Sequence, residues 1–180
     1  GLGTSEATKE VIRDILQGCG KPVVIDADAL TALVGHTEIL SKMKCPRIIT
    51  PHPAEMARLI DAAAADVDAR RLAVASHYAV EWQTVVVLKG APTVVAAPDG
   101  VAYLNTTGNE GMATGGSGDV LTGIIAALLG QGLSAEEAAV LGVYLHGLAG
   151  DLAAENGKIG LAAGQISEKL PRARQKVEGE

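Results

Sequence analysis

The residues best suited to chemistry form a glycine-rich segment at 108–119 that runs directly into an apolar stretch. The segment is GNEGMATGGSGD and the stretch after it is VLTGII. Glycine lets the backbone turn sharply and lets N–H groups approach a ligand closely. Because a helix N-terminus carries a partial positive charge, the pattern predicts an anion site at the start of a helix. Its anion hole would be the backbone N–H groups of Gly116, Ser117 and Gly118.

The glycine-rich segment differs from a P-loop because Asp119, and not a Lys, follows its last glycine. A carboxylate beside a bound phosphate can act as a general base, so we expect Asp119 to be catalytic. Two simpler interpretations stay open. The segment could be a flexible loop, and Asp119 could only complement the helix dipole.

Polar side chains also follow the expected strands at the point where each strand ends. They are Asp26, Asp28, His52, Glu55, Lys89 and Asn105. In open α/β sheets, ligands bind at the carboxyl ends of strands, so we expect these side chains near a ligand. Asp and Asn also favour turns, and Lys is mostly solvated, which leaves a structural interpretation open.

Short apolar runs alternate with helical patterns. Strands are predicted at 23–25, 48–50, 85–88, 93–97 and 101–104, and helices at about 5–18, 29–34, 55–60, 67–82, 120–129, 135–155 and 162–170. The β-branched run at 85–88 is typical of a strand buried on both faces in a parallel sheet. In the first helix, the expected apolar positions are Ala7, Val11, Ile15 and Leu16. The alternation predicts an α/β fold with a mostly parallel sheet.

Composition excludes several classes of protein. The 180 residues are 48% hydrophobic and 20% charged, with a net charge of −6, as in a globular chain with one core. The acidic balance argues against nucleic acid or an anionic membrane as partner. The longest uncharged apolar stretch, 123–130, is far shorter than a membrane span of ~20 residues. Two cysteines exclude a disulfide framework, and we expect a cytoplasmic protein.

The chain begins with Gly1-Leu2-Gly3, a turn of the kind that normally follows a strand. We therefore expect a further segment of the same domain before Gly1.

Six segments together are similar to the ADP/ATP-dependent NAD(P)H-hydrate dehydratases of the ribokinase-like superfamily. They are Gly1–Gly3, Val24–Leu30, Thr50–Glu55, Leu88–Thr93, Asn105–Ile125 and Tyr144–Asp151. The resemblance implies a ribokinase-like three-layer α/β/α fold with a mostly parallel central sheet. It also implies that residues 1–180 form a single domain, the C-terminal two-thirds of the family domain, without its N-terminal part.

The resemblance assigns ligands to several residues. The substrate, NADH or NADPH whose ring has taken up water at C6, contacts Gly1, His52 and Asp119. The adenine nucleotide contacts Gly118 and the stretch Lys89-Gly90-Ala91-Pro92-Thr93. The implied reaction phosphorylates the C6 hydroxyl of the S form and eliminates phosphate.

The resemblance also implies the cofactors. His52-Pro53-Ala54-Glu55 is similar to the form that uses ADP, so we expect ADP before ATP. A His-x-x-Glu motif resembles a superfamily motif that holds Mg²⁺ through water, which makes Glu55 a metal candidate. Asp26 and Asp28 could tune the same site.

Structural alternatives accompany these roles. His52 could be a hydrogen-bonding residue fixed between two prolines, and Glu55 a carboxylate at a helix N-terminus. His146, among leucines, is expected to be packed and not a ligand. Arg70 and Arg71 are expected on a solvated helix face.

Two other functions remain open. One is a kinase of a small vitamin precursor with the same fold, and the other is an inactive nucleotide-binding fragment. The family resemblance also implies a homotetramer, with the apolar stretch 141–150 as a candidate interface, and an epimerase domain fused upstream or encoded separately.

Overall fold

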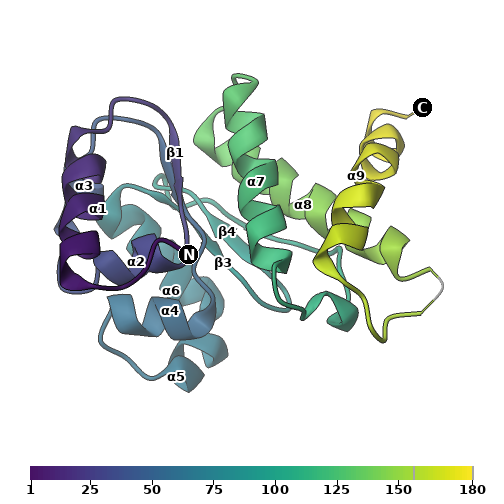
Figure 1. Cartoon of the computed structure of the whole chain (residues 1–180), viewed down its shortest axis with the longest axis horizontal. Coiled ribbons are helices and arrows are strands. Elements are labelled where there is room, and N and C mark those ends of the chain that lie inside the picture. Colours follow the sequence, from purple (N-terminus) through teal and green to yellow (C-terminus); the bar gives the residue numbers. More distant parts are fainter. Residues whose placement is uncertain (156, 180) are drawn as a thin grey trace. The chain divides into compact units, whose positions relative to one another are not determined.

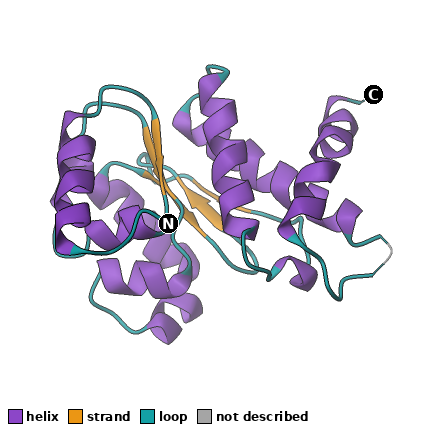
Figure 2. Cartoon of the chain, viewed as in Figure 1, coloured by secondary structure: helices purple, strands orange, loops and turns teal. Residues whose placement is uncertain are grey.

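The computed structural model describes residues 1–155 and 157–179 as an α/β chain (Figures 1 and 2). Contacts divide the chain into two compact units. The first unit contains residues 1–104 and 134–136, and the second contains residues 105–133 and 137–180.

The first unit is built on a five-stranded sheet in the order β1-β2-β3-β4-β5. The strands are β1 Val23–Ile25, β2 Arg47–Ile49, β3 Val85–Leu88, β4 Val94–Ala96 and β5 Ala102–Leu104. β1, β2 and β3 pair in parallel, with Val24 opposite Ile48 and Ile49 opposite Val86. β4 pairs antiparallel with β3 and with β5, so all the strands except β4 point the same way. The mostly parallel sheet is confirmed, and β4 and β5 form a hairpin.

Short helices connect and cover these strands. They are α1 Glu6–Gly18, α2 Asp28–Ala32, α3 Glu38–Lys42, α4 Pro53–Leu59, α5 Ala64–Ala69 and α6 Arg71–Trp82. The Ser5 side chain caps α1 by accepting from the N–H of Thr8 at 3.2 Å. α6 ends at Gln83, whose left-handed backbone (φ 51°) turns the chain toward β3.

The core of the first unit lies between its helices and one face of the sheet. Alternate strand residues such as Ile25, Ile49 and Val86 point into it, and Leu30 of α2 and Met56 of α4 meet them there. All four residues of β3 are buried, which confirms the strand buried on both faces.

The second unit is helical. Its elements are the 3₁₀ helix η1 Glu110–Met112 and the helices α7 Ser117–Gly130, α8 Ala135–Ala153 and α9 Ala163–Glu178. Leu145, Ala149 and Leu152 of α8 form a buried cluster with Ile166 and Ala173 of α9. Across the described residues, the helices are too short or too polar to cross a membrane.

Three expectations for the elements were wrong. In α1, the buried pair is Ile12 and Leu16, while Val11 and Ile15 are 57% and 63% exposed. Leu16 is confirmed, but the buried stripe passes through Ile12 and not through Val11 and Ile15, about 100° around the helix. The helix expected at 67–82 is divided into α5 and α6 at Arg70. α3 was not predicted at all.

α9 is longer than predicted. The helix continues past Pro171 to Glu178, although proline removes one helical hydrogen bond. Beyond the proline, Ala173 lies in the buried cluster that α9 forms with α8.

The central position of Ile49 gives a stability prediction. Its side chain is fully buried in β2, so Ile49→Ala should lower the free energy of unfolding by about 2–5 kcal/mol. Ile159→Ala is the matched control because Ile159 is fully exposed. Urea unfolding gives the midpoint of each variant, and equal midpoints for Ile49→Ala and Ile159→Ala would contradict the assigned core.

Candidate functional site

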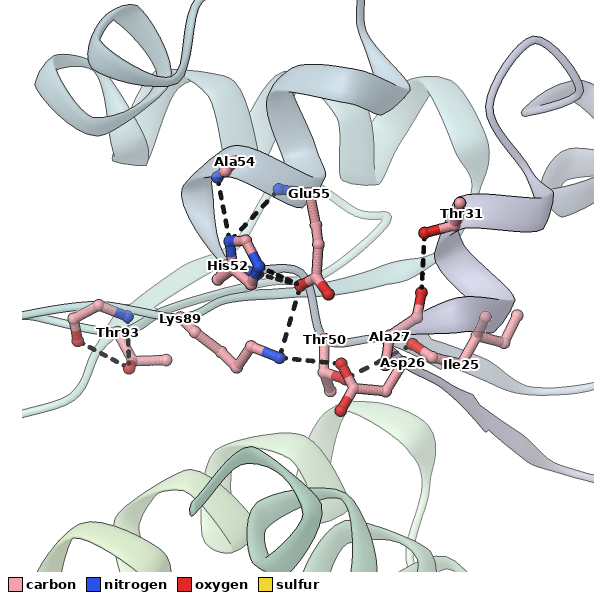
Figure 3. A network of polar contacts seen from close by, with 11 residues as sticks. Ile25, Asp26, Ala27, Thr31, Thr50, His52, Ala54, Glu55, Lys89 and Thr93 are labelled. Carbon is pink, nitrogen blue, oxygen red and sulfur yellow. Dashed lines mark hydrogen bonds and ion pairs between the residues drawn. The ribbon is translucent and has the colours of Figure 1, made fainter. Parts of the chain in front are cut away.

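Parallel strands bring charged side chains to one edge of the sheet in the first unit. Asp26 follows β1 and Lys89 follows β3. Lys89 Nζ donates to Asp26 Oδ1 at 2.8 Å and lies 3.6 Å from Glu55 Oε2 (Figure 3). These side chains are at most 20% exposed, so water and salt screen their charges weakly. We call Asp26, His52, Glu55 and Lys89 the strand-end cluster.

His52 and Glu55 begin helix α4 with a reciprocal capping box. His52 Nδ1 accepts from the N–H groups of Ala54 and Glu55, at 3.1 and 3.4 Å. Glu55 Oε2 accepts from the N–H of His52 at 2.8 Å. These bonds satisfy donors that a helix start leaves unpaired. The structural roles considered for both residues are therefore present, while 47% of the His52 side chain stays exposed.

The first residues of the chain lie beside α2. Asp28 Oδ2 accepts from the N–H of Gly3 at 2.9 Å. A Cβ added to Gly1 would lie 3.3 Å from the same oxygen. Asp28 thus orders the turn that contains Gly1, the predicted substrate contact, and does not join the strand-end cluster.

The stretch 89–93 is held by two side chains. Thr93 Oγ1 donates to the carbonyl of Gly90 at 3.0 Å. Arg71 Nη1 donates to the carbonyl of Pro92 at 2.6 Å, and the Arg71 side chain is only 16% exposed. The expectation of a solvated Arg71 was wrong, because its guanidinium braces this loop.

The glycine-rich segment turns sharply before α7. Gly116 has φ 86°, a left-handed conformation that favours glycine, and α7 begins at Ser117. Gly118 and Asp119 occupy the first turn, where N–H groups have no intrahelical acceptor. The Asp119 side chain is exposed there. A helix N-terminus can bind an anion, and the Asp119 carboxylate lies in the same turn.

His146 of α8 supports the start of α7. Its Nε2 lies 3.3 Å from Ser117 Oγ. Burial lowers the pKa of His146 from 6.5 to about 4, and a hydrogen bond from the imidazole to the backbone of Ser117 opposes this only in part. His146 is therefore neutral at pH 7 and packed, as predicted, but it also contacts the predicted anion hole.

The side chains do not form a magnesium site of their own. Among residues 1–155 and 157–179, no group of three or more His, Cys, Asp or Glu side chains could hold a metal ion. Glu55 faces the ammonium of Lys89 at 3.6 Å, and Lys89 also pairs with Asp26 at 2.8 Å. Mg²⁺ commonly keeps several waters and binds substrate phosphates, so a nucleotide would have to supply most of its ligands.

Asn105 and Asp151 make contacts that were not predicted from the sequence. Asn105 bonds to Thr107 in the second unit. Asp151 of α8 contacts the beginning of the glycine-rich segment, and the only sequence signal for it was its place in the segment Tyr144–Asp151. Contacts between positions 42 and 43 residues apart leave no local pattern.

These features define an α/β protein with a glycine-rich turn at the start of a helix and charged groups at the ends of parallel strands. A family model described as NAD(P)H-hydrate dehydratase matches residues 1–172, and the chain belongs to this family.

Known relatives agree with this assignment. The chain is 51% identical to a bifunctional NAD(P)H-hydrate repair enzyme from Moorella thermoacetica, covering 100% of this chain and 34% of that protein. It is 46% identical to the ADP-dependent (S)-NAD(P)H-hydrate dehydratase of Neisseria meningitidis serogroup B, covering 97% of this chain and 60% of that protein. The chain therefore spans between a third and three-fifths of the length of these relatives.

A solved structure supports the fold. The ADP/ATP-dependent NAD(P)H-hydrate dehydratase of Bacillus subtilis, co-crystallized with ATP/Mg²⁺, has a TM-score of 0.87 and 36% identity. The match covers 98% of this chain and 62% of that one. It confirms the predicted family and the ribokinase-like α/β fold.

The strand-end cluster predicts coupling between its charges. Lys89→Met leaves the carboxylates of Asp26 and Glu55 without their cation, which should cost about 3 kcal/mol of unfolding free energy. The double variant Asp26→Asn/Lys89→Met should lose less unfolding free energy than the sum of the losses in Asp26→Asn and Lys89→Met. The difference, which is the coupling energy, should be about 1–3 kcal/mol.

Lys9→Met is the control for this cycle because the pair of Lys9 and Glu6 lies on the surface. Denaturant unfolding of the three cluster variants measures the coupling. Additive effects would show that Lys89 and Asp26 do not interact.

The buried His146 predicts a pH dependence of stability. Its pKa is about 4 in the folded chain and about 6.5 when unfolded, so the unfolded state binds more protons between these values. The contribution of neutral His146 to the unfolding free energy is fully present above pH 6.5. It is lost as the pH falls toward 4, by about 3 kcal/mol in total.

His146→Gln should flatten this part of the profile, whereas His36→Gln, at an exposed position, should not. Urea unfolding at pH 7.5 and pH 5 compares them. An unchanged profile in His146→Gln would mean that folding does not lower the pKa of His146.

Proposed function

We propose that this chain carries ADP-dependent repair of the S form of NAD(P)H hydrate, returning NADH or NADPH. The observation that carries the proposal is the glycine-rich segment, which places the exposed carboxylate of Asp119 in the first turn of α7. Membership of the family over residues 1–172 supports the substrate class.

The reaction replaces hydroxide, a poor leaving group, with phosphate. The C6 oxygen of the hydrate attacks the terminal phosphorus of ADP, AMP departs, and the hydroxyl proton passes to Asp119. The ring nitrogen then donates its electron pair, the C6–O bond breaks to release inorganic phosphate, and loss of a C5 proton restores the dihydropyridine. Alignment and charge stabilisation supply most of such a phosphoryl transfer.

The proposed roles follow the elements that hold each group. Backbone N–H groups at 116–118 stabilise the transferring phosphoryl group, and each such donor is worth about 3 kcal/mol in a transition state. The N–H of Ser117 donates to the carbonyl of Thr114 at 3.3 Å, so it must leave that hydrogen bond to serve the phosphoryl group. Gly118 and the stretch 89–93 hold the nucleotide, which the bracing of that stretch by Arg71 supports. Gly1 and His52 contact the hydrated nicotinamide.

Mg²⁺ belongs to the proposal as the ion that accompanies the nucleotide phosphates. The Bacillus subtilis dehydratase that was co-crystallized with ATP/Mg²⁺ supports it. ADP is proposed before ATP because the Neisseria relative is an ADP-dependent enzyme. Water-mediated binding of the ion by Glu55 stays a prediction.

The remaining expectations from the sequence also stay predictions. These are a single dehydratase domain over residues 1–180, a cytoplasmic location, a homotetramer, and an epimerase domain fused or encoded separately.

Asp119→Asn tests the proposed base. The change keeps the shape of the side chain but removes the proton acceptor, so turnover should fall by about 10²- to 10⁴-fold. ADP affinity should persist, because the backbone donors remain. The assay follows the return of reduced-nicotinamide absorbance from hydrated NADH with ADP and Mg²⁺.

Asp14→Asn is the control, since Asp14 is an exposed carboxylate on α1. Near-normal turnover in Asp119→Asn would exclude Asp119 as the base. Accumulation of a stable phosphorylated alcohol in the unaltered protein would instead indicate a kinase.

A further inference from the structure

We propose that Asp151 of α8 is a positioning residue that sets the conformation of the glycine-rich segment and thereby its affinity for the nucleotide. The effect on affinity rests on the proposed function, in which the segment binds the phosphates of ADP. The control of the segment's conformation rests on contacts within the second unit alone.

The carboxylate of Asp151 holds the beginning of the glycine-rich segment with both oxygens. Oδ2 accepts from the N–H of Gly108, and Oδ1 accepts from Nδ2 of Asn109, each at 2.9 Å. Asn109 Oδ1 in turn accepts from the N–H of Gly111 at 3.0 Å. A chain of three hydrogen bonds therefore connects α8 to the first turn of η1.

The helix α8 is shaped to receive this loop closely. A Cβ on Gly147 would lie 2.7 Å from the backbone carbon of Thr107, and one on Gly150 would collide with the side chain of Met112. The carbonyl of Tyr144 also accepts from Thr107 Oγ1 at 2.9 Å. Positions 144, 147 and 151 share one face of a helix, so the loop is seated on a continuous surface that ends at Asp151.

Both oxygens of Asp151 are engaged with donors, which distinguishes it from Asp119. An engaged carboxylate suits positioning better than proton transfer. Gly108 has φ 99°, a left-handed backbone, and the bond to Asp151 holds it in this conformation. With residues 108–111 fixed at one end and α7 at the other, the segment is ordered before a ligand arrives, which reduces the entropy cost of binding.

Only a side chain with two acceptors fits this arrangement. In Asp151→Asn, one oxygen can still serve Gly108, but the new amide NH₂ faces the NH₂ of Asn109. Rotating Asn109 would relieve that contact and turn its NH₂ toward the N–H of Gly111. Every arrangement leaves one donor facing another donor, at a cost comparable to an unsatisfied polar group.

The reciprocal change restores the pattern. In Asn109→Asp/Asp151→Asn, the carboxylate at 109 accepts from Gly111 and from the new amide at 151, whose oxygen accepts from Gly108. All three hydrogen bonds return with the same net charge. Asn109→Asp alone instead brings two carboxylates together.

The experiment compares these three variants with the unaltered chain, using Glu155→Gln as control. Glu155 makes only a surface pair with Arg172 among the contacts described. Amide hydrogen exchange of residues 108–116 is measured without nucleotide, and ADP binding and turnover are measured separately.

Asp151→Asn and Asn109→Asp should each speed exchange in 108–116 and weaken ADP binding by about 10-fold or more. The nucleotide KM should rise more than kcat falls. The double variant should return to within about 3-fold of the unaltered protein. If a single variant does not fold, a folded double variant still shows whether swapping the two side chains restores the hydrogen bonds.

Exchange and affinity that are unchanged in Asp151→Asn would overturn the proposal, as would a double variant no better than either single one. An unaltered chain that fails to bind ADP would contradict the proposed function. In that case the exchange measurements still decide whether Asp151 orders the loop.

Discussion

The parallel direction of β1, β2 and β3 is the constraint on which the charged part of the structure depends. Because these strands end at the same edge, residues 63 positions apart place an ammonium 2.8 Å from a carboxylate. Glu55 joins them while also closing the capping box of α4. Removing the charge of Lys89, Asp26 or Glu55 would leave a nearly buried charge without full compensation, so these three residues act as a unit.

The glycine-rich segment presents the opposite physical problem. Glycine allows close approach to an anion, but it also costs more conformational entropy to order than any other residue. The second unit meets that cost with side chains outside the segment. Asp151 fixes its beginning, and His146 contacts Ser117 at its junction with α7. Rigid support from α8 orders a flexible sequence, as the proposed anion site requires.

Much of this arrangement could be predicted from the sequence because it is local. The β-branched run of β3 and the position of Asp119 at a helix start each follow from neighbouring residues. The buried face of α1 was misjudged because Val11 and Ile15 fit the same helical spacing as Ile12 and Leu16. Arg71 and Asp151 were missed because their partners are distant in the chain.

The central claim, phosphorylation followed by elimination, is tested most directly by stoichiometry. The protein is incubated with hydrated NADH, Mg²⁺ and ADP, and NADH, AMP and inorganic phosphate are measured together over time. The account predicts that the three products appear in equal amounts and that none appears when ADP is left out. Return of NADH without AMP, or AMP and phosphate without NADH, would contradict it.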